Sequence, residues 1–350
     1  MDAQALAEVF SKLDESDIDI SLSGYDADAI ERIMVELPTD HNIDMDEADE
    51  NVPDIPLTPV TRTGDLWKLG NHRLVCGDST QHGTYAMLMQ GELAQLIVTD
   101  PPYNVNYEGA AGKIQNDNME SAVFRAFLRD MYTAAAAVTE NGSAAYIFHA
   151  DSEGVAFREE YQNAGFLLKQ CLIWVKNNFV LGRQDYQWRH EPILYGWKAG
   201  ASHYFTEDRS ISTVFDNHKR PDFGGMSRDE LVEFIELIYD GADELPASIL
   251  YFDKPTRNTE HPTMKPTALI GRLIENSSRH GWIVLDPFGG SGSTLIACEA
   301  LGRKARTIEL DPRFADVIVR RYIQTTGKRD VVLVRDGVEI PIEVTGILNE

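Results

Sequence analysis

Two short segments of this chain combine residue types that can bind an amine and a nucleoside. One is Thr99-Asp100-Pro101-Pro102-Tyr103, which ends an apolar run, and the other is Asp286-Pro287-Phe288-Gly289-Gly290-Ser291-Gly292-Ser293-Thr294, far downstream. The Asp100 carboxylate can accept a hydrogen bond from an amino group, and the two prolines after it have no backbone N–H. Tyr103 adds a flat ring on which an extruded base can stack, worth roughly 1–3 kcal/mol per base in single-strand binders. The first segment therefore suits the exocyclic amine of adenine.

The second segment reads as a nucleoside-binding turn between a strand and a helix. A predicted strand ends at Asp286, the glycines of the loop let backbone approach a ligand closely, and Ser293-Thr294 open a predicted helix. Glu309 ends the next predicted strand, where an acidic side chain can accept both ribose hydroxyls. A phosphate-binding P-loop needs Gly-Lys-Ser/Thr, and the dinucleotide fingerprint needs a small residue where Leu295 stands. A phosphate-free adenosyl ligand is favoured, and an ordinary strand–helix turn is the alternative.

The elements that must position these segments follow an α/β pattern from Trp67 onward. Short apolar runs alternate with longer stretches of helical spacing, which is typical of a largely parallel sheet. Seven strands are predicted, at 72–76, 93–99, 144–149, 167–175, 192–197, 282–286 and 305–309. Helices are predicted at 122–138, 152–164, 267–278, 293–301 and 312–325. The acidic residues of both segments fall at strand ends, where ligands bind near a reversal of strand order.

The composition predicts an intracellular globular protein. With 350 residues and 43% hydrophobic content, the chain can form one large domain or two modest ones. Cys76, Cys171 and Cys298 are odd in number and widely spaced, which predicts neither disulfides nor a metal cluster. No apolar run approaches the roughly 20 residues of a membrane-spanning helix, and there is no basic-then-apolar leader. We therefore expect a cytoplasmic protein with no metal site and no membrane contact.

The negative charge is concentrated near the N-terminus. A net charge of −24 opposes DNA binding, because phosphate contacts supply most non-specific affinity. Residues 1–60, however, hold 17 acidic and 2 basic residues, so −15 of the charge lies there and −9 in residues 61–350. The body can still present local basic faces. In this acidic leader, 3–13 and 26–37 have helical spacing, and the Asp/Glu/Pro-rich stretch 41–59 predicts a flexible linker.

The two segments, in this order, resemble the motifs of amino-methylating DNA methyltransferases that use S-adenosylmethionine, in the subclass whose catalytic motif precedes its cofactor motif. The resemblance covers about 66–326 and rests on several motifs. Adenine-N6 members carry Asp-Pro-Pro-Tyr, as at 100–103, and cytosine-N4 members more often begin with Ser. The resemblance implies a Rossmann-like class I methyltransferase fold: a seven-stranded, mostly parallel sheet with permuted motif order and an inserted target-recognition segment. It also implies DNA as the substrate and S-adenosylmethionine as the cofactor.

The resemblance further implies a role for each matching residue. Asp100 and the Pro101 carbonyl accept the two hydrogens of the adenine amine, Pro102 completes the corner, and Tyr103 stacks on the flipped base. Thr263 or Lys265, in the element His261-Pro262-Thr263-Met264-Lys265-Pro266, meets the methionine carboxylate. Asp78, after Gly77, lies near cofactor and target, although a simple turn explains this pair equally well. The remaining cofactor-binding residues are Asp286, Pro287, Phe288, Gly290, Ser291, Gly292, Thr294 and Glu309.

Five parts are predicted along the chain. They are an acidic leader and linker at 1–60, a catalytic half at 61–198, a target-recognition segment at 199–258, a cofactor-binding half at 259–330, and a C-terminal extension at 331–350 with a β-hairpin. The leader resembles the end of a ParB-like module that precedes methyltransferase domains in phage and prophage proteins. Residues 174–178 and 189–191 resemble the stretch before the family's target-recognition region.

Several alternatives stay open at the level of sequence. Cytosine-N4 methylation needs the same amine geometry, and Asp/Asn-Pro-Pro-Tyr corners also serve RNA and protein-amide methyltransferases. A non-catalytic DNA-binding relative is a further alternative, against which the intact Asp100, Gly290, Gly292 and Glu309 argue. Relatives often dimerise, so a homodimer is an expectation that no sequence pattern tests. Neither the recognised DNA site nor a restriction partner leaves a trace in the sequence.

Overall fold

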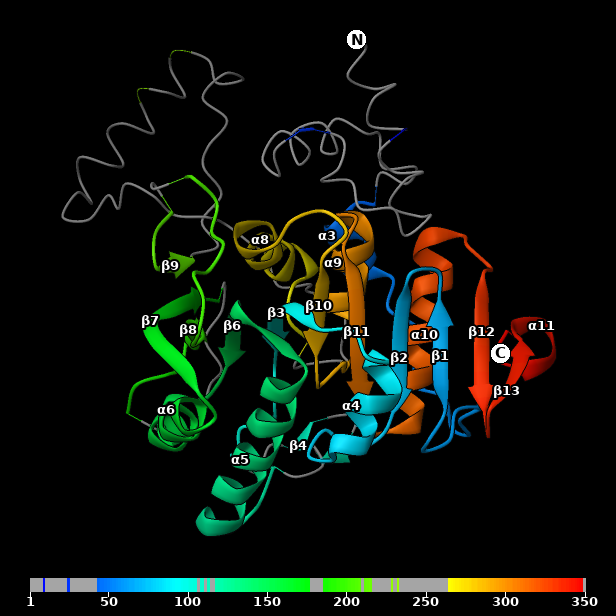
Figure 1. Ribbon diagram of the computed structural model, residues 1–350, viewed down its shortest axis with the longest axis horizontal. Coiled ribbons are helices and arrows are strands. Elements are labelled where there is room, and N and C mark those ends of the chain that lie inside the picture. The colour runs from blue at the N-terminus through cyan, green and yellow to red at the C-terminus, as the bar shows by residue number, and fades with distance from the viewer. Residues whose placement is uncertain are drawn as a thin grey trace.

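The computed structural model describes residues 43–105, 108–109, 112–113, 117–176, 185–208, 211–215 and 264–348, with single residues elsewhere. Most of the acidic leader, most of the predicted target-recognition segment and Thr263 lie outside these ranges. Figure 1 shows a central sheet flanked by helices. Among the described residues, no helix combines the length and the apolar character needed to cross a membrane.

The described strands of the main sheet form one continuous layer (Figure 1). They are β1 (Leu66–Leu69), β2 (His72–Cys76), β3 (Ala94–Thr99), β6 (Thr139–Phe148), β7 (Phe166–Val175), β8 (His190–Lys198), β9 (Val214–Phe215), β10 (Ile283–Asp286), β11 (Lys304–Glu309), β12 (Val331–Arg335) and β13 (Val338–Pro341). Their order across the sheet is β13-β12-β1-β2-β11-β10-β3-β6-β8-β7-β9. A separate pair, β4 (Glu108–Gly109) and β5 (Gly112–Lys113), follows the Tyr103 region.

The seven strands predicted from sequence are the adjacent central strands β2, β11, β10, β3, β6, β8 and β7. The first five pair in parallel, and β8 is antiparallel to both β6 and β7, so only β8 of the seven is reversed. This confirms a mostly parallel, Rossmann-like sheet. The described sheet is wider than predicted because β1, β12 and β13 extend one edge and β9 the other. β1 and β9 have four and two residues, too short for a clear pattern, whereas β12 and β13 form an antiparallel hairpin where the sequence predicts one, within 331–350.

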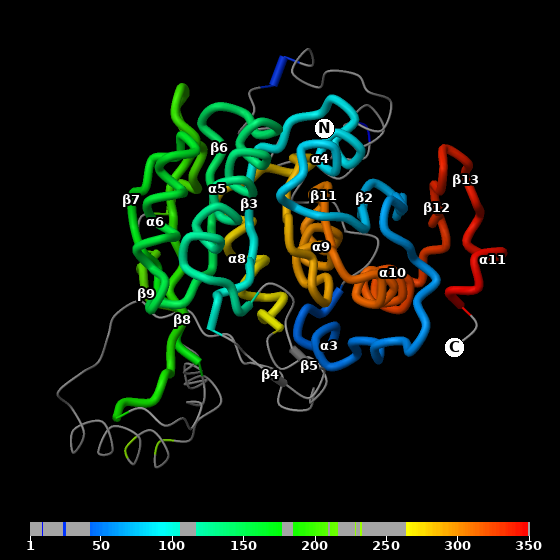
Figure 2. The backbone as a smooth tube through the Cα atoms, turned by 90° about the horizontal axis from the view of Figure 1, so that it is seen from below, coloured from blue at the N-terminus to red at the C-terminus, as the bar shows by residue number. Residues whose placement is uncertain are grey.

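Helices cover both faces of the sheet. On one face lie α4 (His82–Met89), α5 (Ser121–Ala137) and α6 (Gly154–Asn163), the last preceded by the 3-10 turn η2 (Asp151–Glu153). On the other lie α3 (Met45–Glu50), α8 (Thr267–Ser277), α9 (Ser293–Ala300) and α10 (Pro312–Thr326). Figure 2 shows α4 and α10 on opposite sides of β2. A short α11 (Ile342–Thr345) follows β13. The sequence missed α3 and α4, which are both short.

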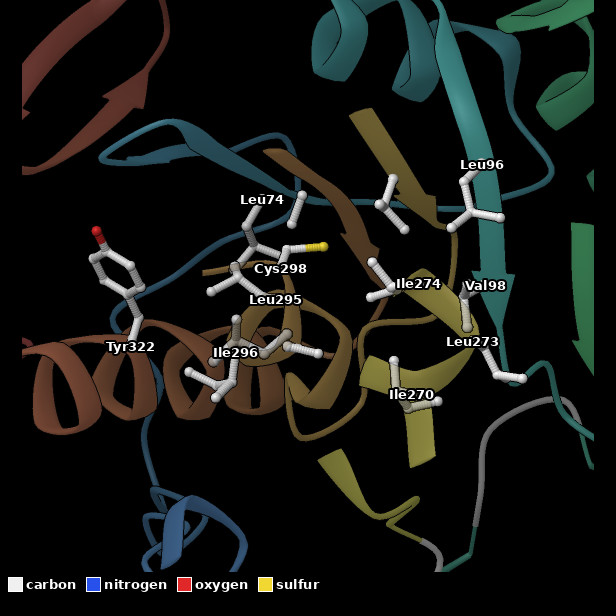
Figure 3. Packing of buried hydrophobic residues seen from close by; sticks show 14 of the residues in the cluster. Leu74, Leu96, Val98, Ile270, Leu273, Ile274, Leu295, Ile296, Cys298 and Tyr322 are labelled. Carbon is white, nitrogen blue, oxygen red and sulfur yellow. The ribbon is translucent and has the colours of Figure 1, made fainter. Parts of the chain in front are cut away.

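Alternating residues of the central strands divide the core between these two layers. Leu96 and Val98 of β3 pack with α8 and α9, as Figure 3 shows, whereas Ile97 between them packs with the α5 layer. This alternation follows from the two-residue period of a strand. Since both faces are buried, the strand sequences read as continuous apolar runs rather than as alternating ones.

Residues 43–61 pack on the body, so the prediction of a flexible linker at 41–59 is wrong for the described part of that stretch. Asp44 caps α3 by accepting from the backbone N–H of Asp46 at 2.9 Å. Asp49, only 1% exposed, accepts from the backbone N–H of Thr267 at 2.7 Å and from Arg321 Nη2 at 2.7 Å. The partners of Asp49 are more than 200 residues away in the sequence. Composition alone therefore made this stretch look like a solvated run of charges.

A second attachment comes from α10. Asp316, with no exposed surface, accepts from the backbone N–H groups of Val60 and Thr61 at 2.6 and 3.0 Å. The helix itself is well specified, because Asp311 caps its N-terminus, Pro312 occupies its first turn and Gly327 ends it with a φ of 70°. Two buried carboxylates, one on each partner, therefore fix 43–61 to the body.

We predict that the position of an N-terminal truncation decides whether the body stays stable. Removing residues 1–56 takes away Asp49 and leaves Arg321 as an unpaired buried charge, which costs about 3–5 kcal/mol of unfolding free energy. Removing residues 1–42 keeps both attachments. Urea denaturation of the two truncated proteins measures the difference, and equal unfolding free energies would contradict the proposed attachment.

Candidate active site

Three adjacent parallel strands bring the predicted site residues to one edge of the sheet. Asp286 ends β10, Glu309 ends β11, and Asp100 directly follows β3, whose neighbour is β10. The chain passes from β10 to β11 through α9 and from β3 to β6 through α5, so strand order reverses between β10 and β3. Thr99 Oγ1 donates to Asp286 Oδ1 at 2.7 Å across that reversal. Ligands of open α/β sheets bind at such a position.

The loop between β10 and α9 needs its glycines. Gly290 and Gly292 have φ values of 52° and 87°, in the left-handed region that glycine tolerates best. Gly289 needs its small size instead, since a Cβ there would lie 2.5 Å from Thr307 Cγ2 and 2.8 Å from Ile318 Cδ1. The loop is therefore a tight turn held close to β11 and α10, with Ser291 between the two left-handed glycines.

Two carboxyl groups brace this loop: Asp286, which is buried, and Glu309, which is partly buried. Glu309 accepts from the backbone N–H of Gly290 at 2.8 Å and of Asp311 at 2.9 Å, one bond on each oxygen. Asp286 accepts from the Phe288 backbone N–H at 3.1 Å in addition to Thr99. Burial raises the pKa of each carboxyl to about 7, although these hydrogen bonds act in the opposite direction. Both groups therefore titrate near neutral pH.

The other predicted cofactor residues surround the same loop. Pro287, Ser291 and Thr294 are buried, and Phe288 is partly exposed. Gly77 donates its backbone N–H to the Glu309 carbonyl oxygen at 2.9 Å, which places the Gly77-Asp78 pair beside β11. The Asp78 carboxylate accepts from the Thr80 backbone N–H and hydroxyl, each at 2.8 Å. Asp78 thus forms a local turn next to the loop.

Asp100 lies in a compact cluster of charges. Its Oδ1 accepts from the Tyr103 hydroxyl at 2.5 Å, and its Oδ2 accepts from Lys265 Nζ at 2.5 Å. Lys265 Nζ also lies 3.2 Å from Glu191 Oε2, and Lys176 pairs with the other oxygen of Glu191. Two ammonium groups therefore balance two carboxylates, and each oxygen of Asp100 already has a donor.

The two carboxyl groups of this cluster have opposite pKa shifts. Burial raises the pKa of Asp100, and the Lys265 ammonium only partly offsets that effect. Burial also acts to raise the pKa of Glu191, but Lys265 and Lys176 together lower it to about 2. Glu191 therefore keeps its charge, whereas the ionisation of Asp100 depends on the ammonium beside it.

Asn104 fixes the chain after the Asp-Pro-Pro-Tyr corner. It has a φ of 60°, which Asn tolerates better than most residues, and its Oδ1 accepts from the Met119 backbone N–H at 2.6 Å. Its side chain ties the corner to the residues before α5.

Lys265, which the resemblance assigns with Thr263 to the methionine carboxylate, lies between the Asp-Pro-Pro-Tyr corner and the start of α9. Its ammonium binds Asp100, and its backbone carbonyl accepts from Ser293 Oγ at 2.9 Å. Sequence reasoning also gave no role to Glu191 and Lys176. A charged residue at the start of the apolar run 192–197 was the available signal, because a buried carboxylate there needs a cation.

Comparison with known proteins identifies the family. A family model described as DNA methylase matches residues 94–320. The chain belongs to this family. It is a DNA methyltransferase of the group that methylates adenine N6 or cytosine N4, as the motifs predict. A second model, described as the ParB-methyltransferase HTH domain, matches residues 4–63, which confirms the ParB-like resemblance.

Individual relatives of this methyltransferase are distant. The type II methyltransferase M.HpaI of Haemophilus parainfluenzae is 24% identical over 72% of this chain and 74% of its own length. The DNA adenine methyltransferase YhdJ of Escherichia coli K12 is 27% identical over 66% of this chain and 76% of its own. Among solved structures, an M1.HpyAVI–SAM complex aligns with a TM-score of 0.48 and 21% identity, covering 71% of this chain and 98% of that one.

We predict that the ligand-free protein loses stability as pH rises from about 4.5 to about 7. Glu309 and Asp286 ionise near pH 4 in an unfolded chain but only near 7 when folded. The folded state therefore holds more protons in that window, and the loss from the two groups together is about 5 kcal/mol. Urea denaturation across this pH range measures it.

Glu309→Gln is the matched control for this prediction, because the amide keeps the shape of the side chain and does not titrate. The variant should show a flatter dependence of unfolding free energy on pH. An unchanged slope would mean that other groups carry the effect.

Proposed function

We propose that this methyltransferase moves the methyl group of S-adenosylmethionine to N6 of an adenine flipped out of duplex DNA. The observation that carries the proposal is the position of Asp100 at the reversal of strand order, one residue from the Thr99–Asp286 hydrogen bond that joins the Asp-Pro-Pro-Tyr corner to the glycine loop. An amine acceptor and a nucleoside-binding loop thereby lie side by side at one edge of the sheet. Such proximity is what direct group transfer requires.

The residues of the loop fit an adenosyl ligand. Each oxygen of Glu309 has one backbone donor and so keeps acceptor capacity for a ribose hydroxyl. The loop contains no lysine, which is consistent with a nucleoside that carries no phosphate. Asp286, Phe288, Ser291 and Thr294 complete the walls. When bound, S-adenosylmethionine supplies an electrophilic methyl group on a sulfonium.

Asp100 and its neighbours act on the target base. The adenine amine is a weak nucleophile because its lone pair is delocalised into the ring. The acceptors of the site must therefore form hydrogen bonds with its two hydrogens. Asp100 accepts one hydrogen and the Pro101 carbonyl the other, which favours a pyramidal nitrogen. When the amine binds, it replaces one of the two groups that now donate to Asp100, either the Tyr103 hydroxyl or the Lys265 ammonium. Glu191 retains Lys265 during the exchange, since it already lies 3.2 Å from the ammonium.

Adenine is favoured over cytosine by two observations. The motif begins with Asp100 rather than Ser, and YhdJ, which matches over most of its length, is described as a DNA adenine methyltransferase. Cytosine-N4 methylation is the second candidate, because the amine geometry is the same and the family includes such enzymes. Base extrusion serves both targets.

We also propose that residues 199–258 form the target-recognition segment, that residues 1–60 form a separate N-terminal part, and that the protein forms a homodimer. We infer that the target-recognition segment lies between β8, which ends at Lys198, and α8, which begins two residues after Lys265; within this stretch Val214–Phe215 rejoin the sheet as β9. A segment inserted between these elements would enter next to the catalytic corner.

We predict that two substitutions separate chemistry from cofactor binding. Asp100→Ala should abolish methyl transfer to DNA and leave S-adenosylmethionine affinity within a few-fold of wild type. Glu309→Ala should weaken that affinity by roughly 1–3 kcal/mol, because two ribose hydroxyls lose their acceptor. Calorimetry measures affinity and a radiolabel assay measures transfer. Normal turnover by Asp100→Ala would refute the catalytic assignment.

Lys265→Met tests the two roles considered for this lysine. If the ammonium serves Asp100, its loss raises the pKa of that carboxyl, and the acidic limb of the kcat–pH profile should move upward by about one pH unit. Cofactor affinity should change little. An unmoved pH profile with much weaker affinity would instead place Lys265 at the methionine carboxylate. Lys176→Met is the control, because Lys176 pairs only with Glu191 of the two carboxylates.

A further inference from the structure

Arg321 joins three segments that are far apart in the sequence. It lies on α10, its side chain has no exposed surface, and its guanidinium donates in two directions. Nη1 donates to the Ser291 carbonyl oxygen at 3.0 Å and lies 3.3 Å from Ser293 Oγ. Nη2 donates to Asp49 Oδ1 at 2.7 Å and to the Ala48 carbonyl oxygen at 3.1 Å. One side of the fork therefore contacts the glycine loop and the other contacts α3.

Stability alone does not explain a buried ion pair such as Arg321–Asp49. Removing two charges from water is expensive, and well-packed apolar residues often replace such a pair without loss of stability. A planar guanidinium, however, holds two groups at a fixed separation, which neither an apolar side chain nor a lysine does. The geometry therefore suits a fixed spacer between α3 and the loop.

The glycine loop needs an external constraint at this point. Ser291 stands between Gly290 and Gly292, whose left-handed backbones are the most permissive in the loop. The Arg321 bond to the Ser291 carbonyl fixes the peptide that joins Ser291 to Gly292. Ser293 Oγ in turn donates to the Lys265 carbonyl at 2.9 Å, so the same contact reaches the residue whose ammonium binds Asp100.

We propose that Arg321 is a positioning residue for the cofactor loop, and that Asp49 orients it. Residues 43–61 lie within the stretch that matches the HTH domain model, so the last residues of that match directly support the cofactor site. The inference rests on the proposed S-adenosylmethionine site. Cofactor affinity and the integrity of α3 are then coupled, and by linkage the coupling is reciprocal.

The chain supplies its own matched control. Asp316 lies on the same helix, is equally buried and binds the same segment, but its two oxygens accept from Val60 and Thr61 rather than from a group that reaches the loop. Asp49→Asn and Asp316→Asn therefore each weaken the attachment of 43–61. Of these two changes, Asp49→Asn alone removes the charge that orients Arg321.

The test compares full-length wild type, Asp49→Asn and Asp316→Asn by calorimetry with S-adenosylmethionine and by hydrogen–deuterium exchange of Ser291 to Ser293 in the ligand-free protein. Asp49→Asn should bind about tenfold more weakly and exchange the loop amides faster, because contacting residues couple by that order. Asp316→Asn should match wild type in both measurements at a comparable loss of melting temperature. Equal affinities for the two variants would overturn the proposal.

Arg321→Lys decides the matter if Asp49→Asn does not fold. It keeps a cation beside Asp49 but lacks the second arm, so it should bind S-adenosylmethionine more weakly. Wild-type affinity in this variant would refute the positioning role. A wild-type protein that fails to bind S-adenosylmethionine at all would instead refute the proposed function, which distinguishes the two failures.

Discussion

The carboxyl ends of β3, β10 and β11 meet at one edge of the sheet, and everything else in the site depends on the acidic groups held there. Parallel pairing forces Asp100, Asp286 and Glu309 together, and burial raises the pKa of all three. Repulsion is limited because each carboxyl receives donors: Asp286 and Glu309 mainly from backbone or hydroxyl groups, Asp100 from Lys265 and Tyr103. The site is thus rich in acceptors, each already paired with a donor of the protein itself.

Lys265 connects the Asp-Pro-Pro-Tyr corner with the start of α9. Its carbonyl accepts from Ser293, at the start of α9, while its ammonium binds Asp100 and Glu191. The ligand-free site is consequently closed on itself, with each oxygen of Asp100 occupied. A target amine must compete with an internal donor, which favours bases that also stack and fill the pocket. Glu191 makes that competition feasible, because it gives the displaced ammonium a second carboxylate.

Motifs and periodicity predicted the parts of this molecule that local sequence determines. The seven central strands, the glycine loop and the Asp-Pro-Pro-Tyr corner are all written in short stretches, whereas the reversal of β8 is seen only in the structure. Pairings across long sequence distances were not predictable. Asp49 looked like one more solvated acid in a charged leader, yet it meets Arg321 272 residues away, and Glu191 gave no sign of Lys265. Only the contacts in the folded chain show that these charges are paired.

We propose that the acceptor corner at Asp100 selects the adenine amine. The most direct measurement is the identity of the modified nucleoside: duplex DNA of mixed sequence is incubated with the full-length protein and S-adenosylmethionine carrying a labelled methyl group, digested to nucleosides and analysed by mass spectrometry. We expect the label in N6-methyldeoxyadenosine. Label in N4-methyldeoxycytidine would contradict it, even with the fold and the cofactor site as described.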